Sequence, residues 1–162
     1  MHGAVTTDRR LAPLDERHPE NRGVLAHLAR GGPVHGDSIA RPSSVPDAYQ
    51  GCGCHPDVVE HLWDVLGREL PRAARALVLG TPALVHAQAG IVLAVGLGTT
   101  YALRLSAAAL IEPASAALAS AHTFRTAGEH LDLVTWSPRW RFGAYLAHEP
   151  GWLAAAAAEF DA

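Results

Sequence analysis

Both cysteines of the chain lie in one short segment, "GCGCHP" at residues 51–56, and a histidine follows them directly. Thiolate sulfur and imidazole nitrogen are common ligands of zinc and other transition metals, and a thiolate is also the nucleophile of disulfide chemistry. Pro56 is typical of the first position of a helix, and the positive end of a helix dipole lowers the pKa of a nearby thiol. Cys52, Cys54 and His55 are therefore candidate metal ligands or the residues of a thiol-dependent redox site.

The spacing of the two cysteines leaves the chemistry open. Structural zinc sites usually separate their cysteines by two to four residues and take a second ligand pair from elsewhere in the chain. Here only Gly53 separates them, and the chain has no other cysteine. A bound zinc or other transition metal, a reversible disulfide between Cys52 and Cys54, and a helix start without chemistry remain alternatives.

The ten histidines do not form a second metal-binding motif. They are dispersed along the chain, and no two stand at the His-x-x-x-His spacing that places both on one face of a helix. His86, at the end of an apolar run, is expected to be a buried structural histidine whose tautomer is fixed by a backbone carbonyl. The sequence predicts no catalytic residues.

Gly36, Asp37, Ser38 and Ile39 resemble the nucleophile block of the GDSL-type esterases. That family places its serine directly after a buried strand and takes its histidine from a late Asp-x-x-His motif. In this chain no buried strand precedes the serine, and the only Asp-x-x-His, at residues 15–18, lies upstream of it. The resemblance therefore does not predict an esterase.

A second glycine motif, "GLGTT" at residues 96–100, suits a phosphate-binding loop only if a helix follows it. The residues that follow alternate between apolar and polar side chains, which is typical of a strand. We therefore expect a hairpin turn at this position.

Helical periodicity predicts three helices, at residues 18–29, 56–70 and 152–160. In the second helix, one stripe is apolar and the opposite face is polar. The apolar stripe comprises Val58, Leu62, Val65 and Leu66, and the polar face comprises Asp57, Glu60, His61, Asp64 and Arg68.

Short apolar runs separated by glycine-containing breaks follow at residues 75–105 and predict an antiparallel meander. Residues 76–103 contain no charged side chain and are long enough to cross a bilayer, but glycines and Pro82 interrupt them every few residues. Buried strands are thus expected, with no membrane association. The predicted fold is α+β: an antiparallel sheet of about four to six strands with two or three helices packed mainly on one face. Residues 1–17 are expected to be a flexible lead-in and residues 18–162 a single domain.

Alternation also predicts a strand near residues 139–146, which we expect to share a sheet with residues 99–105. One face would cover the core. The other would be either a solvated outer face or a face that binds a protein or an anion, because arginine and tyrosine are enriched at protein interfaces. The core-facing residues would be Tyr101, Leu103, Trp140 and Phe142, and the partner-binding residues would be Arg104, Arg139, Arg141 and Tyr145.

The formal net charge is −3, and the 13 basic residues, all arginine, are scattered along the chain. This distribution provides no basic field for a phosphate backbone, so no nucleic-acid partner is expected. The first twenty residues lack the apolar run of a secretory signal, which predicts a cytoplasmic location. The leading hypothesis is a small cytoplasmic accessory, adaptor or neutralising protein of bacterial type, which binds another protein without catalysis or cofactor. The alternative is a metal- or thiol-dependent protein that uses Cys52, Cys54 and His55.

Overall fold

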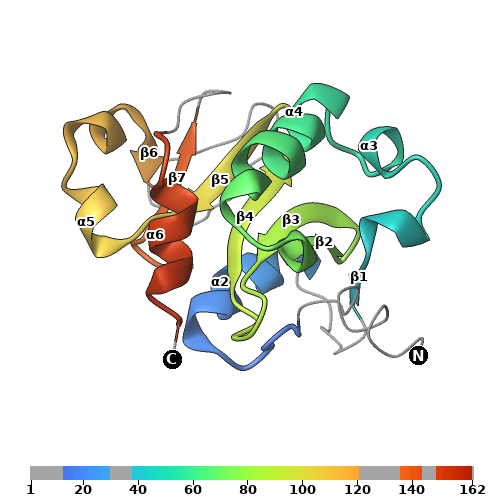
Figure 1. The fold of residues 1–162 in the computed structure, drawn as a ribbon, viewed down its shortest axis with the longest axis horizontal. Helices are drawn as coiled ribbons and strands as arrows, with labels where there is room; N and C mark the ends of the chain where they lie inside the picture. Colours follow the sequence, from blue (N-terminus) through green and yellow to red (C-terminus); the bar gives the residue numbers. More distant parts are fainter. Residues whose placement is uncertain (1–12, 30–37, 121–135, 144–148, 162) are drawn as a thin grey trace.

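The computed structural model describes residues 13–29, 38–120, 136–143 and 149–161, which form a seven-stranded antiparallel sheet with helices on both faces (Figure 1). The strand order is β1-β2-β3-β4-β5-β7-β6, so the first five strands form a meander and β7 lies between β5 and β6. This confirms the predicted α+β fold with an antiparallel sheet. The strands are β1 (Ile39–Ala40), β2 (Arg75–Val78), β3 (Thr81–Val85), β4 (Val92–Leu97), β5 (Thr100–Arg104), β6 (Ala119–Ser120) and β7 (Trp140–Gly143).

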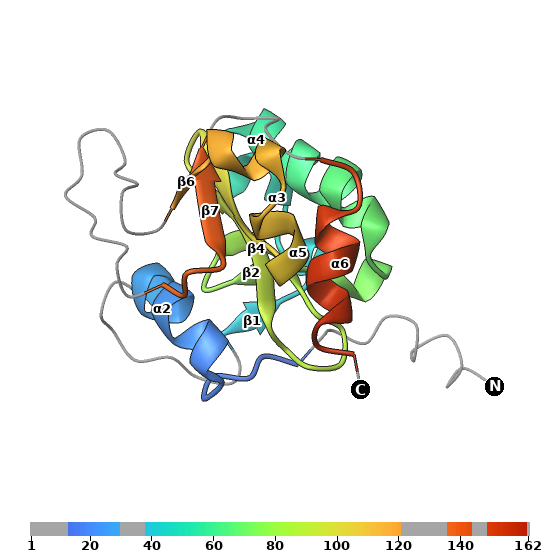
Figure 2. The ribbon, with the colours of Figure 1, turned by 90° about the vertical axis from the view of Figure 1, so that its left-hand side faces the viewer.

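Helices cover the two faces of the sheet unequally. The helix α2 (Pro19–Ala29) lies on one face, and α6 (Trp152–Ala158) lies on the opposite one (Figure 2). The helix α4 (Pro56–Glu60) covers the same face of the sheet as α6. It continues as a π-helical turn (His61–Val65) and a 3-10 turn (Leu66–Glu69). The remaining short helices are α3 (Ala48–Gly51) and α5 (Ala107–Leu110), with 3-10 turns at Pro42–Ser44, Arg72–Ala74 and Pro113–Ala117. Within the described part of the chain, no helix has the length and apolar character needed to cross a membrane.

The sheet separates two hydrophobic cores. Leu62, Leu103 and Leu153 belong to the core between the sheet and the α4 and α6 side. Val24 of α2 and Trp140 of β7 belong to the core on the opposite side. Because both faces are covered, β3 and β4 are buried along almost their entire length, which is why their sequences are apolar runs without alternation.

The pairing of β5 with β7 corrects the predicted faces. Leu103 lies opposite Arg141, and Arg104 lies opposite Trp140. Residues directly opposite each other in an antiparallel pair project to the same face. Trp140 and Phe142 therefore share the α2 face with Arg104, whereas Arg141 shares the other face with Leu103. The prediction that Arg104 and Arg141 lie on one exposed face is wrong, because alternation does not specify the register between strands.

The π-helical turn corrects the predicted stripe of the second helix. Val65, expected to be buried, is 40% exposed, and His61, expected on the polar face, is only 8% exposed. A π turn contains an extra residue, so the side chains within and after it rotate away from the 3.6-residue pattern. His61 consequently stacks on Tyr101 of β5, with ring centroids 5.8 Å apart.

Asn21 of α2 ties the start of the described chain to the turn between β3 and β4. Its buried amide nitrogen donates to the carbonyls of Asp15 (2.6 Å) and Gly90 (2.8 Å), and its amide oxygen accepts the N–H of Val92 (2.9 Å). The N–H of Asp15 also donates to the carbonyl of Gly90 (3.0 Å). Residues 13–17, expected to belong to a flexible lead-in, are therefore held against the sheet; residues 1–12 lie outside the described part.

We expect Gly90→Ala to destabilise the fold more than Gly98→Ala. Both glycines have a positive φ, +70° and +62°, which costs an alanine about 1–2 kcal/mol. A Cβ at Gly90 would also lie 2.6 Å from the carbonyl oxygen of Pro13, whereas one at Gly98 would meet nothing within 4 Å. Urea denaturation followed by tryptophan fluorescence gives the two free energies of unfolding. Equal losses would contradict the close packing of residues 13–15 on this turn.

Candidate functional site

The cysteine segment lies beside the turn between β4 and β5. The N–H of His55 donates to the carbonyl of Gly98 at 2.8 Å and so joins this segment to the hairpin. Both cysteines are free thiols; Cys54 is buried and Cys52 is partly exposed. Gly53, whose φ is +81°, turns the chain between the two thiols, and Cys52 lies close enough to raise the pKa of Cys54. The structure thus brings the two sulfurs together on one side of a tight bend.

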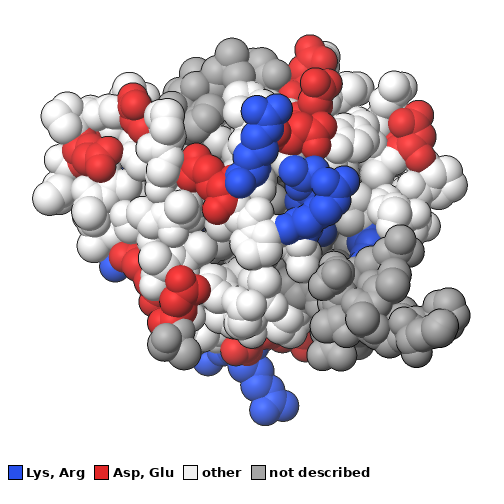
Figure 3. Space-filling model, in the orientation of Figure 1, with Lys and Arg blue, Asp and Glu red and all other residues white. Residues whose placement is uncertain are grey.

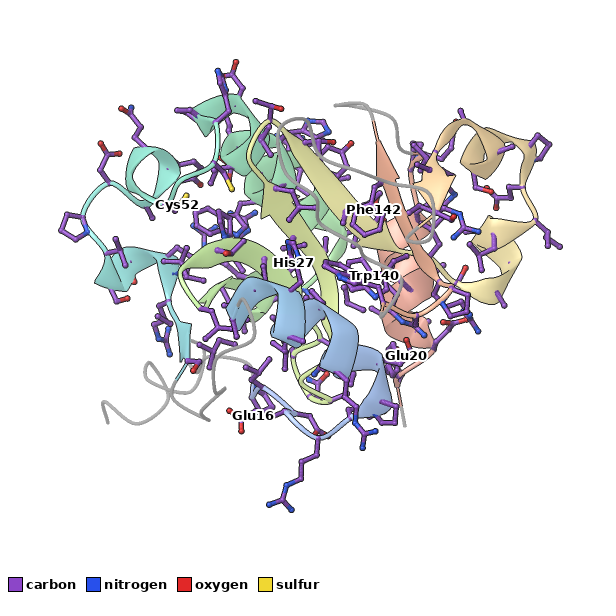
Figure 4. The ribbon with its side chains drawn as sticks, turned by 180° about the vertical axis from the view of Figure 1, so that it is seen from behind. Glu16, Glu20, His27, Cys52, Trp140 and Phe142 are labelled. Carbon is purple, nitrogen blue, oxygen red and sulfur yellow. The ribbon has the colours of Figure 1, made fainter. Side chains whose placement is uncertain are left out.

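Both cysteines line a cavity of about 170 Å³. The rest of the lining includes His27 and Leu28 at the end of α2, Gly96 of β4, and Gly98 in the turn that follows β4. Figure 4 views the molecule from the α2 side, with His27 on α2 and Cys52 on the loop that precedes α4. His27 is therefore a residue of this site that sequence spacing did not indicate, because 25 positions separate it from Cys52.

The surroundings of Cys54 raise the pKa of its thiol. The expectation that the helix start lowers this pKa is therefore wrong. Burial raises the pKa of Cys54; the N–H of Gly98 lowers it, and the neighbouring Cys52 thiol raises it again, so the net pKa lies above its ordinary value. The helix that follows, α4, has only five α-helical residues, and its dipole does not offset the burial. Cys54 is thus held as a thiol in the resting protein.

His55 is oriented toward the helix start. Its Nδ1 accepts the N–H of Asp57 at 3.1 Å and so caps α4, and its side chain is about half exposed. In the described residues, no group of three or more His, Cys, Asp and Glu side chains is placed to hold a metal ion. The zinc or other transition-metal site with Cys52, Cys54 and His55 stays a prediction, with the two sulfurs as its neighbouring ligands.

His86 forms an ion-pair contact that resembles a proton-transfer dyad, but both of its ring nitrogens are occupied. Its Nδ1 accepts the N–H groups of Gln88 (3.2 Å) and Ala89 (3.0 Å), so its proton resides on Nε2 and is donated to Asp161 Oδ1 at 2.8 Å. A general base needs a nitrogen free to take a proton from a substrate. His86 is therefore a buried, hydrogen-bonded histidine, but the Asp161 carboxylate takes the place of the predicted backbone carbonyl.

Arg104 is buried, with 3% of its surface exposed, and it does not belong to an exposed binding face. Its Nε donates to Glu20 Oε2 of α2 at 3.1 Å, and its Nη1 donates to Glu159 Oε1 at 2.9 Å. The guanidinium also lies over the ring of Phe160, 4.6 Å from its centroid. The two carboxylates and the ring compensate the desolvation of the guanidinium.

Arg139 belongs to the same ion-pair network. Its Nη1 donates to both carboxylate oxygens of Glu159, at 2.9 and 2.8 Å. Burial alone would raise the pKa of Glu159, but hydrogen bonds from Arg139, from the N–H of Ala107 and from Arg104, with the charge of Arg139, lower it to about 2. The network joins α2, β5, α5, α6 and the loop before β7, so Arg104 and Arg139 have an internal structural role.

Arg141 differs from Arg104 and Arg139. Its Nη1 donates to the carbonyls of Pro138 and Trp140, both at 2.8 Å, and no described carboxylate forms an ion pair with it. Burial lowers the pKa of Arg141, because part of its charge is removed from water. Tyr145, the fourth predicted partner-binding residue, lies outside the described residues.

Arg141 lines an open groove of about 440 Å³ between α5, the 3-10 turn that follows it, and β6. The apolar wall of the groove includes Ile111, which is 86% exposed. Pro113 interrupts residues 106–120, whose sequence fits a broken helix or a loop equally well, so periodicity did not indicate Ile111. The available signal was a large β-branched residue among alanines and serines, directly before Glu112 and Pro113. The other apolar residues of the groove are Leu110, Pro113, Ala116, Leu118 and Ala119.

The polar side chains around the groove hold its shape. The hydroxyl of Ser115 donates to the carbonyls of Leu110 and Glu112, both at 2.9 Å, and this closes the loop after α5. The carboxylate of Glu112 accepts the indole N–H of Trp152 at 2.9 Å, which anchors the loop to α6. The groove is therefore a preformed surface feature.

The tryptophans of the second half of the chain do not provide an exposed interface. Trp136, Trp140 and Trp152 are each at most 3% exposed. Trp136 packs edge-on against Trp140 and Phe142 in the core beneath α2, with ring centroids 4.8 and 5.0 Å apart.

On the face shown in Figure 3, acidic and basic side chains are interspersed and do not form one continuous basic patch.

The fold and these contacts define an α+β protein with an antiparallel sheet covered on both faces. Comparison of the chain with protein-family models, with curated protein sequences and with solved structures found no significant match. Its function must therefore be inferred from its own residues.

We expect Glu159→Gln to lower the free energy of unfolding by about 2 kcal/mol at neutral pH, because the buried Arg104 and the adjacent Arg139 lose a shared carboxylate. The folded pKa of Glu159, about 2, lies below its ordinary value of 4.5. The carboxylate therefore contributes stability that is present above about pH 4.5 and is lost as the pH falls toward 2. The difference between the two proteins in urea denaturation should shrink over this range.

The matched control is Glu60→Gln, which removes the same charge from an exposed position on α4. Its effect should stay within about 0.5 kcal/mol. An equal effect of the two substitutions would contradict a specific role of the Glu159 network.

Proposed function

We propose that this protein acts by binding another protein, through the groove that contains Ile111 and Arg141. The observation that supports the proposal is the combination of an exposed isoleucine with a partly desolvated guanidinium that has no described carboxylate partner. A large exposed apolar side chain beside a polar rim is typical of interaction sites. An accessory, adaptor or neutralising role is consistent with such a site.

The chemistry of the groove specifies the kind of segment that fits it. A guanidinium that already donates to carbonyls can still donate its remaining N–H groups to a carboxylate, and such charge-assisted hydrogen bonds are the strong ones. Ile111 and Leu118 offer apolar surface along the same groove. We therefore infer a partner segment that places an aspartate or glutamate against Arg141 and an apolar side chain over Ile111.

Arg139 does not take part in the proposed recognition, although sequence alternation grouped it with Arg141. Its guanidinium donates to both carboxylate oxygens of Glu159 and to the carbonyl of Leu105. Charge reversal at Arg139 would weaken the fold, so a loss of binding in that variant would not identify an interface. Arg141 and Ile111 are the informative positions.

Site-directed photo-crosslinking tests the proposal. A benzophenone amino acid replaces Ala116, an exposed residue of the groove, in the cells that produce the protein naturally. We expect one discrete crosslinked protein, whose crosslinked peptide carries an acidic residue next to apolar ones. Ile111→Asp and Arg141→Glu should each reduce the yield about tenfold or more, as expected for residues central to an interface.

The matched controls are Val65→Asp and Arg68→Glu, which make the same changes at exposed positions of the α4 side. They should leave the crosslinking yield unchanged. An unchanged yield in the Ile111 and Arg141 variants would contradict the proposal, and so would a basic crosslinked peptide. A crosslink to a second copy of the chain would show that the groove serves self-association instead.

A further inference from the structure

The two thiols differ in exposure although they line the same cavity. Cys52 is partly exposed, whereas Cys54 is buried, and only Gly53 separates them in the cavity lining. A small reactant can therefore reach Cys52 first, and the buried thiol stands directly behind it. This is the arrangement of an attacking and a resolving cysteine, in which the exposed thiol forms a first bond and the second thiol displaces it.

The surrounding backbone accommodates this pair and leaves room beside it. A Cβ at Gly96 of β4 would lie 3.1 Å from the sulfur of Cys54, so only a glycine lets the strand approach the thiol this closely. A Cβ at Gly53, between the cysteines, would meet nothing within 4 Å, so the loop that carries Cys52 is open on that side. The cavity is thus tight around Cys54 and open around Cys52.

We propose that Cys52 and Cys54 form a thiol–disulfide exchange site whose substrate is a low-molecular-weight disulfide of a small polar thiol, bound in the adjoining cavity. The cavity volume, about 170 Å³, suits one small thiol. Apart from the thiols, its lining is mostly backbone glycine and leucine, with His27 and Thr81 as the other polar side chains. The surface that this lining exposes is more polar than apolar, so it accepts a compact thiol that carries a polar group.

The reaction proceeds in two balanced steps. Cys52 loses its proton to water, and its thiolate attacks one sulfur of the disulfide; the sulfur–sulfur bond breaks, and one thiolate leaves and is protonated. Cys54 then loses its proton and attacks the Cys52 sulfur of the mixed disulfide, which releases the second thiol. The two cysteines are oxidised to one disulfide, and the external disulfide is reduced to two thiols.

This exchange site is separate from the proposed binding groove, since the two share no lining residue. The proposal adds a reaction and a substrate class to the two neighbouring sulfurs. It also assigns different roles to them, which their sequence context does not distinguish.

The test uses the full chain, reduced and freed of reductant, under anaerobic conditions with hydroxyethyl disulfide as the probe. We expect two equivalents of released thiol per protein and an intact mass that has lost two hydrogens. The variant Cys54→Ser should stop at a mixed disulfide on Cys52. The variant Cys52→Ser should react about tenfold or more slowly, because burial restricts access to Cys54 and disfavours its thiolate.

Circular dichroism confirms that each variant is folded, and the thiol release from the unaltered protein does not depend on the variants. A mixed disulfide that persists in the unaltered protein would overturn the proposal. A reaction that occurs only when the chain is unfolded in urea would overturn it as well. A metal ion retained by both thiols in native mass spectrometry would also overturn it. None of these results would alter crosslinking at the groove, so the two proposals fail independently.

Discussion

The arrangement of the helices and strands depends on the ion pairs of the buried Arg104 guanidinium. A charge in this position requires carboxylates around it, and these come from α2 through Glu20 and from α6 through Glu159. The same Glu159 accepts from Arg139 and from the N–H of Ala107, so one side chain connects the loop before β7 with the start of α5. Removal of any partner would leave a desolvated charge, which restricts how α2 and α6 can pack on the two faces of the sheet.

The ion pairs within the fold also distinguish Arg141 from Arg104 and Arg139. Arg104 and Arg139 are satisfied by carboxylates within the fold, whereas Arg141 contacts only carbonyls among the described residues. The register of β5 and β7 explains the difference, because it turns Arg141 toward the groove beside α5 and turns Arg104 toward α2. A shift of one residue in this register would therefore exchange the faces of Arg141, which lies in the proposed binding groove, and Arg104, which is structural.

The thiol pair follows a different constraint, namely the close approach of a hairpin to a loop. Gly96 lets β4 lie against Cys54, and the carbonyl of Gly98, in the turn that follows, accepts the N–H of His55. The burial that results raises the pKa of Cys54, while Cys52 stays partly exposed. The asymmetry of the two thiols thus comes from the packing of β4 and β5, not from the helix that follows them.

Periodicity along the chain was enough to predict the helices near residues 18–29, 56–70 and 152–160, the hairpin at "GLGTT", the structural role of His86 and the α+β class, because these depend on neighbouring residues. It failed where distant segments meet. The burial of Arg104 depends on strand register. The burial of His61 and the exposure of Val65 depend on a π-helical turn. The set of residues that lines the groove with Ile111 depends on the packing of α6. Helical and strand periods describe one element at a time, whereas contacts between elements are set by the three-dimensional packing of both cores.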